Sequence, residues 1–361
     1  MKKIFVLPML SVLALASCGD SSSIVYNVQR KLASFSEETS LISSVAADAL
    51  NSYRLMSPVN YVNHLNLIGA LSDDSYVSNN SSLISKNPTS VLKSMKESYT
   101  FDSSDDLNYA SRLVTVVGTN LDVKDKDLVS TLTNDYQVKF LNGSDYTYEN
   151  VNSFIRDNTL NGITIPEDQF KDVNVFSASI LSYKANFDFK PTETTVTTAA
   201  EKEVAALQMT ISSSYVENDK YIYAEIPVLD ETLKVLMPKE NYAFNSADLL
   251  SNSEKTGAIV SLTVPEIHLD SSMYDTPSQK YSLDLKGSMG KFVDTSAAKY
   301  GMILNLTKFD MDVNGILADS VSFTSTPIAT EDKVELLINN DFYFALVDKN
   351  NTPMFVGYQS L

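Results

Sequence analysis

The chain contains few histidine and cysteine side chains, which are common nucleophiles, general bases and zinc ligands. Its 361 residues include two histidines and one cysteine, too few for a zinc site of the usual Cys/His type. A Ser-His-Asp triad would need His64 or His268 as its base. His64 stands in the apolar sequence Y-V-N-H-L-N-L and His268 in the strand-like sequence E-I-H-L, so both are expected to be structural or surface residues. The sequence contains no G-x-S-x-G elbow, P-loop or dinucleotide fingerprint. It therefore predicts neither an enzyme nor a cofactor.

One segment near the C-terminus is informative about function. Residues 313–330, V-N-G-I-L-A-D-S-V-S-F-T-S-T-P-I-A-T, are small and hydroxyl-rich and are neither helix-like nor core-like. They are followed by two apolar runs, Phe342 to Val347 and Met354 to Tyr358, on either side of the turn sequence D-K-N-N-T-P. Two such runs around a turn predict a hairpin buried in the core. The stretch before the hairpin is therefore interpreted as an exposed loop with a functional role.

The single cysteine, Cys18, directly follows a segment with the features expected of a secretory signal. Met1-Lys2-Lys3 is a positive start, Ile4 to Ala16 is apolar, and Leu15-Ala16-Ser17-Cys18 closes the segment. These last four residues resemble the bacterial lipobox, in which the cysteine receives a diacylglyceryl group and becomes the first residue. The apolar run is shorter than the roughly 20 residues that span a bilayer, whereas two acyl chains suffice for stable anchoring. The resemblance implies a signal peptide at residues 1–17, a polar tether at 18–23, and anchoring outside the cytoplasm at the cell membrane or outer envelope. A plain cleaved signal is the alternative.

The amino-acid composition limits the classes of molecule that the protein is expected to bind. Acidic residues outnumber basic ones by 45 to 28, which gives a formal net charge of −17. Neither nucleic acid nor an anionic membrane surface attracts a protein of this sign, so nucleic-acid binding is not expected. The 43% hydrophobic and 20% charged residues are typical of a globular protein. No repeat or long linker divides the chain, and residues 24–361 are predicted to form one domain.

The first half of the chain favours helices and the second half strands. Helices are predicted around Ile24–Leu32, around Leu41–Leu50, and from Leu107 onward, where the preceding D-S-S-D-D of residues 102–106 is typical of a helix cap. Strands are predicted at Tyr221–Pro227, Leu233–Met237, Ile259–Val264 and Met302–Leu306. Helices followed by strands indicate an α+β fold with a large mixed or antiparallel sheet.

The order of the segments resembles that of the serpins. A glycine, a small-residue loop and a buried C-terminal hairpin ending in F-V-G match the serpin C-terminus. Val175 to Phe187, followed by Phe189-Lys190-Pro191, resembles the central serpin strand that ends in Y-F-K-G-x-W, with Phe187 in place of the tryptophan. Further matches are Val151 to Ile155 with Thr159, Gly162 and Ile163; Glu225-Ile226-Pro227 followed by Val235 to Glu240; and Leu262 to Ile267 followed by Tyr274-Asp275. The resemblance implies a serpin-like α+β fold. That fold has N-terminal helices, a large central mixed sheet, further sheets, and an exposed reactive-centre loop at about residues 315–333.

Several departures concern the region that opens and shuts the central sheet in that family. The chain has no tryptophan, no histidine just before the loop, and Ser43-Ser44 where a Ser-Pro pair is expected. The approach Val313-Asn314-Gly315 is shorter and less acidic than V-N-E-E-G. Ile316 replaces the usual Thr or Ser. This stiff, β-branched apolar residue is expected either to pre-seat the hinge of the loop or to hinder it.

The resemblance also implies a mechanism. A serpin is cleaved in its loop, and the loop then inserts into the sheet as a new strand. The hinge would begin at Gly315, and the cleaved bond would lie at or next to Ala329-Thr330. Strand side chains alternate with period two, and Asp319, the only charge in the inserting stretch, would face outward, which avoids the cost of several kcal/mol for a buried carboxylate. The inward residues would all be apolar, small or hydroxyl-bearing: Ile316, Ala318, Ser320, Ser322, Thr324 and Thr326.

The function implied by the resemblance is inhibition of an extracytoplasmic serine or cysteine protease by a lipid-anchored protein. Its expected partners are that protease and, through the lipid, the membrane. A small residue before the cleaved bond suits the shallow pockets of elastase-like or subtilisin-like serine proteases. The alternative is a non-inhibitory binding or surface lipoprotein with the same fold.

Overall fold

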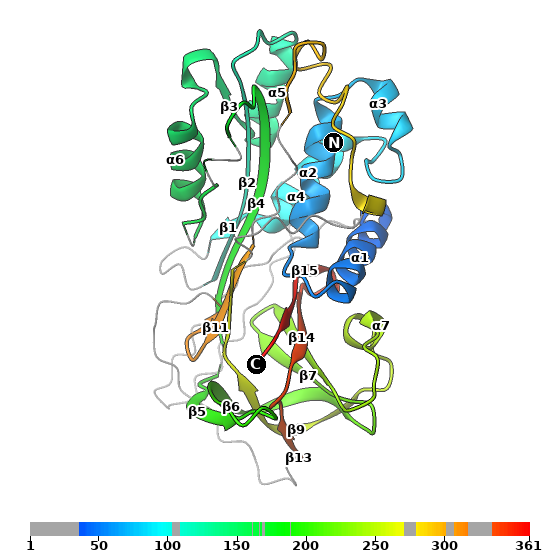
Figure 1. Ribbon diagram of the computed structural model, residues 1–361, viewed down its shortest axis with the longest axis vertical. Helices are drawn as coiled ribbons and strands as arrows, with labels where there is room; N and C mark the ends of the chain where they lie inside the picture. The colour runs from blue at the N-terminus through cyan, green and yellow to red at the C-terminus, as the bar shows by residue number, and fades with distance from the viewer. Residues whose placement is uncertain are drawn as a thin grey trace, which may run out of the picture.

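The computed structural model describes residues 36–102, 109–160, 162–165, 167, 170–187, 189–270, 279–300, 307–316 and 334–361. Within them lie a seven-stranded and an eight-stranded sheet, with most helices gathered around the first (Figure 1). The helices are α1 (Ser36–Asn51), α2 (Pro58–Ala70), α3 (Asp74–Asn79), α4 (Pro88–Tyr99), α5 (Lys126–Tyr136), α6 (Tyr148–Asn158) and α7 (Ser246–Leu250). The strands are β1 (Phe101–Asp102), β2 (Tyr109–Thr119), β3 (Lys139–Asn142), β4 (Val175–Asn186), β5 (Thr192–Thr197), β6 (Glu203–Glu217), β7 (Tyr221–Val228), β8 (Glu231–Pro238), β9 (Thr256–Pro265), β10 (Ile267–Asp270), β11 (Lys308–Asp312), β12 (Gly315–Ile316), β13 (Val334–Leu337), β14 (Phe342–Val347) and β15 (Pro353–Gln359).

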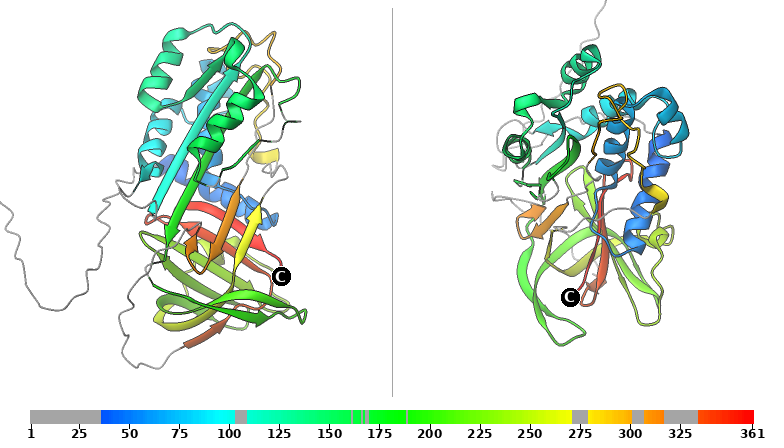
Figure 2. Two further views of the ribbon diagram at one scale, coloured as in Figure 1. Left: turned by 90° about the vertical axis from the view of Figure 1, so that its left-hand side faces the viewer. Right: turned by 45° about the horizontal axis from the view of Figure 1, so that its top comes forward.

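The seven-stranded sheet has the order β1-β2-β4-β12-β11-β10, with β3 beside β2. Its two long strands, β2 and β4, pair antiparallel along their whole length, from Tyr109 opposite Ala185 to Thr119 opposite Val175 (Figure 2, left). Helix α6 covers one face of this pair, and α2 and α4 cover the other (Figure 1). Both strands are therefore buried along nearly all their length.

Helix α2 is the central helix of the fold. Its N-terminus is set by Ser57, whose side chain accepts a hydrogen bond from the Asn60 amide, and by Pro58 in the first turn. All thirteen of its residues are buried. A helix enclosed on every side must also enclose its polar residues, so those residues need partners within the protein.

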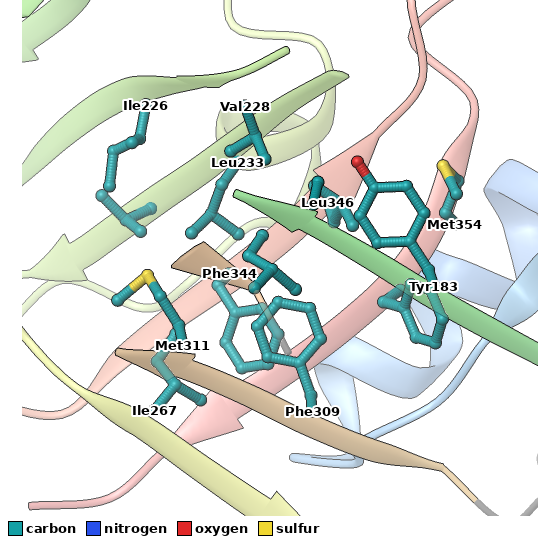
Figure 3. Close-up of a cluster of buried hydrophobic side chains, with 14 of the residues drawn as sticks. Tyr183, Ile226, Val228, Leu233, Ile267, Phe309, Met311, Phe344, Leu346 and Met354 are labelled. Carbon is teal, nitrogen blue, oxygen red and sulfur yellow. The ribbon is translucent and has the colours of Figure 1, made fainter. Parts of the chain in front are cut away.

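The eight-stranded sheet has the order β13-β9-β6-β7-β8-β14-β15, with β5 beside β6. The predicted C-terminal hairpin is confirmed: β14 and β15 pair from Phe342 opposite Gln359 to Val347 opposite Pro353, and β14 is buried throughout. Figure 3 shows where this hairpin meets the other sheet, with Phe344 of β14 beside Phe309 and Met311 of β11. One hydrophobic cluster therefore joins both sheets.

The predicted helix around Leu41–Leu50 and the predicted strands over β4, β7, β8 and β9 are confirmed. The helix predicted from Leu107 onward is wrong, because residues 109–119 form strand β2. This strand is covered on both faces, so its apolar residues do not alternate and the segment acquires an incidental helical spacing. The predicted helix at 24–32 and the predicted strand at 302–306 lie outside the described residues. Within the described residues no helix is long and apolar enough to cross a membrane.

Candidate functional site

The candidate site is the point where the chain leaves β11 and returns as β12. A tight turn at Val313-Asn314 reverses the chain, and Gly315-Ile316 then lies between β11 and β4. Ile316 is opposite Met311 on one side and opposite Ala185 on the other. We call this position of Gly315-Ile316 between β4 and β11 the hinge seat.

Gly315 is required by the geometry of the seat. Its φ is +125°, outside the range that L side chains readily adopt. A Cβ at this position would lie 2.4 Å from the carbonyl oxygen of Ala185 and 2.7 Å from the Cα of Asn186. Both obstacles are backbone atoms of β4 and cannot move aside as a flexible side chain can. Glycine is therefore the residue that lets the returning chain approach β4.

The side chain of Ile316 is buried in the hinge seat. It is 1% exposed and belongs to the hydrophobic cluster shared by the two sheets. The register places it in one row across five strands, Tyr109–Ala185–Ile316–Met311–Ile267. Ile316 therefore occupies a strand position in this sheet, and its effect on loop insertion stays a prediction.

A buried carboxylate lies next to this row. Glu231, the first residue of β8, is 2% exposed and accepts hydrogen bonds from the hydroxyls of Tyr109, at 3.0 and 3.1 Å, and Tyr183, at 2.8 Å. Tyr109 belongs to β2 and Tyr183 to β4, so one side chain ties both long strands to the other sheet beside the seat. Charge-assisted bonds of this kind are roughly twice as strong as neutral ones.

A polar network fixes β4 to α2 farther along the sheet. Asn60 donates its Nδ2 to the Ser179 carbonyl at 2.7 Å, and the Ser179 hydroxyl donates back to Asn60 Oδ1 at 2.7 Å. Asn63 Nδ2 donates to Ser179 Oγ at 2.8 Å, and His64 Nε2 is hydrogen-bonded to Ser177 Oγ at 2.9 Å. The buried polar side chains of α2 are thus hydrogen-bonded to Ser177 and Ser179 of β4.

The two histidines lie in different surroundings. His64 on α2 and its partner Ser177 on β4 are both buried. Burial lowers the pKa of His64 to about 4, against the opposing effect of a hydrogen bond with the Ser177 backbone. His268 is exposed, with its ring nitrogens 3.2 Å from Glu266 and Asp310. Partial burial lowers its pKa, but the hydrogen bonds to these two carboxylates outweigh that effect, and the net shift is upward.

Of the residues predicted to form the site, Gly315 and Ile316 lie in the seat. Ala318, Ser320, Ser322, the bond Ala329-Thr330 and the lipidation site Cys18 lie outside the described residues and stay predictions. Sequence reasoning missed the α2–β4 network, although a signal was present. Asn60, Asn63 and His64 stand at helical spacing within an otherwise apolar segment. The sequence around Glu231 contains no comparable pattern.

No family model and no curated protein matches this chain in sequence. Many solved structures match its fold. The thermophilic serpin Tengpin in its native state has a TM-score of 0.71 at 14% identity, over 92% of this chain and 96% of that one. Serpin48 of the insect Tenebrio molitor has a TM-score of 0.69 at 13% identity, over 89% and 96%. Thyroxine-binding globulin in complex with thyroxine has a TM-score of 0.67 at 11% identity, over 88% and 98%.

Proposed function

With the serpin fold as the premise, we propose that this protein is a protease inhibitor that acts by inserting its cleaved loop into the seven-stranded sheet. The hinge seat is the observation that carries the proposal. Two residues of the chain after β11 already occupy a strand position between β4 and β11. The sheet thus already pairs with the first two residues of the segment that inhibition by insertion would add as a strand.

The side of the sheet on which Ile316 is buried supports the same conclusion. Because Ile316 faces the core, period-two alternation assigns Ala318, Ser320 and Ser322 to the inward side of a growing strand. These side chains are small enough to enter the sheet, and their hydroxyls can be hydrogen-bonded there. Asp319 is assigned to the outward side. At the far end of β4, Val175 forms a parallel bridge with Tyr300, and complete insertion would have to part this bridge.

The target and the location are further parts of the proposal. Cleavage at or next to Ala329-Thr330 would present a small residue to the protease, which favours an elastase-like or subtilisin-like serine protease. A lipid on Cys18 would hold the inhibitor outside the cytoplasm, at the cell membrane or outer envelope. These parts are supported by the residue types in the sequence.

The test is to incubate the purified protein with an elastase-like protease and look for a covalent complex that survives SDS. Mass spectrometry of the released C-terminal peptide should place the cleaved bond at or next to Ala329-Thr330. Ser320→Arg should abolish the complex, because it places an unpaired charge on the inward face, whereas Asp319→Arg on the outward face should retain most of it. Equal loss of the complex in both variants would contradict insertion with Ser320 facing inward and Asp319 facing outward.

The second candidate is a non-inhibitory binding protein with the same fold. The similarity to thyroxine-binding globulin in complex with thyroxine favours it, because that structure is a binding protein with this architecture. The two functions differ in the effect of loop cleavage on stability. Insertion adds a strand to the sheet, so cleavage of an inhibitor should raise the thermal midpoint sharply. An unchanged midpoint after loop cleavage would favour the binding protein.

A further inference from the structure

We propose that the cavity between α2, α3, α4 and α5 is a binding site for a small amphipathic carboxylate, of the size of a medium-chain fatty acid. Helices α3 and α5 lie at the end of the molecule opposite β13 (Figure 1). The site therefore shares no residue with the hinge seat, and it does not depend on the proposed inhibitory function.

The cavity has the size of a small-molecule site. Its volume is about 490 Å³, within the range of roughly 300–1,000 Å³ that such sites occupy. Its lining comes from the end of α2, one face of α3, the beginnings of α4 and α5, and Lys291. The residues from α3 include Asp74, Val77 and Ser78, which stand three and four positions apart and so share one helix face.

Part of this lining is apolar. It includes Ala70 of α2, Val77 of α3, Pro88 of α4 and Leu128 of α5. Val77 and Leu128 are only partly buried, and they pack against the hydrophobic cluster that contains Ala70. An apolar ligand in the cavity would remove this surface from water, which favours binding.

The charged part of the lining is mainly positive. It contains two lysines, Lys86 and Lys291, against one carboxylate, Asp74, in a chain whose formal net charge is −17. Lys291 Nζ lies 2.8 Å from Asp74 Oδ1, and the Asp74 side chain is 94% exposed. An ammonium group has three donors, so Lys291 can bind a ligand carboxylate while it contacts Asp74. An apolar chain with a carboxylate at one end matches both parts of the lining.

The backbone that carries Lys291 is held in place. The Lys291 amide donates to the Leu71 carbonyl at 3.1 Å, just after α2. The Met289 amide donates to Ser72 Oγ at 2.7 Å. These bonds position Lys291 before a ligand arrives, which lowers the entropy cost of binding.

A neighbouring cavity indicates the direction of the ligand. This second cavity, of about 540 Å³, shares Lys291 with the first. Apart from Gly290, its lining among the described residues consists of three lysines and three aspartates. Such a lining offers no apolar surface to a hydrocarbon chain. We therefore assign the chain of the ligand to the first cavity and its carboxylate to the end near Lys291.

The test is isothermal titration calorimetry of the purified protein with octanoate. Octanoate should bind at one site, decanoate about tenfold more tightly and hexanoate about tenfold more weakly, because two buried methylenes correspond to about this factor. Lys291→Gln should weaken octanoate binding about fivefold. Lys93→Gln is the matched control, since Lys93 is an exposed lysine of α4 outside the cavity lining, and it should bind like the wild type. The uncharged 1-octanol should bind more weakly than octanoate.

A second pair of variants tests the location without changing charge. Ser78→Trp should abolish octanoate binding, because the indole would fill the cavity from an exposed position of α3. Asn79→Trp, at the next exposed position and outside the described lining, should retain it. No binding of octanoate by the wild type, equal affinity in the wild type and Lys291→Gln, or equal affinity in the two tryptophan variants would overturn the site. Binding of 1-octanol as tight as that of octanoate would overturn the role of the carboxylate.

Discussion

Acid should destabilise this protein through His64, the buried histidine of α2. Its pKa in the folded protein is about 4, because burial disfavours the charged imidazolium, whereas the unfolded chain has the ordinary value of 6.5. Between these two values the unfolded state binds more protons than the folded state. The free energy of unfolding therefore falls as the pH falls through this window.

The expected change in the free energy of unfolding follows from the folded and unfolded pKa values of His64. At pH 7.5 His64 is neutral in both states and contributes almost nothing to the pH dependence. At pH 5.5 protonation of the unfolded state lowers the free energy of unfolding by about 1.4 kcal/mol, and near pH 4 the loss approaches about 3 kcal/mol. The protonated ring would have to stay buried beside Ser177. Acid should therefore loosen the α2–β4 network first.

The measurement is urea unfolding at pH 7.5 and pH 5.5 for the wild type and His64→Gln. The variant should lose about 1.4 kcal/mol less than the wild type over this interval, and titrating carboxylates cancel in the comparison. His268→Gln is the control. Its raised pKa means that His268 contributes stability below the unfolded value of 6.5, and this is lost as the pH rises through the folded value. This control should therefore shift the pH dependence in the opposite direction. Parallel losses in the wild type and His64→Gln would refute the reasoning.

The remaining predictions concern the seat, the core and the anchor. Gly315→Ala should expel β12 and cost about 2 kcal/mol or more, from backbone strain and the clash with Ala185, whereas Gly257→Ala, with open space around it, should change the urea midpoint little. Equal midpoints in the two variants would contradict the seat geometry. Phe355→Ala in the buried hairpin should cost about 3–5 kcal/mol in urea unfolding, and a loss below about 1 kcal/mol would contradict its place in the core. Cys18→Ser should move the protein out of the detergent phase in a partitioning assay, and unchanged partitioning would rule out lipid anchoring at this residue.

The strand runs of the second half could be predicted from the sequence because each is short, apolar and bounded by turn residues. The same holds for β14 and β15, whose runs flank a single turn and need no information from elsewhere in the chain. The assignment at Leu107 failed for the opposite reason. Strand β2 is decided by its pairing with β4 along its whole length, and this distant partner overrides the local capping signal at residues 102–106.

The sequence by itself determined which residues could enter a sheet after Gly315, since side-chain size and period-two alternation are local properties. It also narrowed Ile316 to two roles, pre-seating the hinge or hindering it. The position of Ile316 between Ala185 and Met311 is a different matter, because it exists only when β4 and β11 are brought together. The same is true of His64, whose depressed pKa arises from burial against β4 and not from its neighbours in the chain. Local chemistry set what these residues can do, and long-range packing decided what they do, because burial and pairing are properties of the assembled sheet.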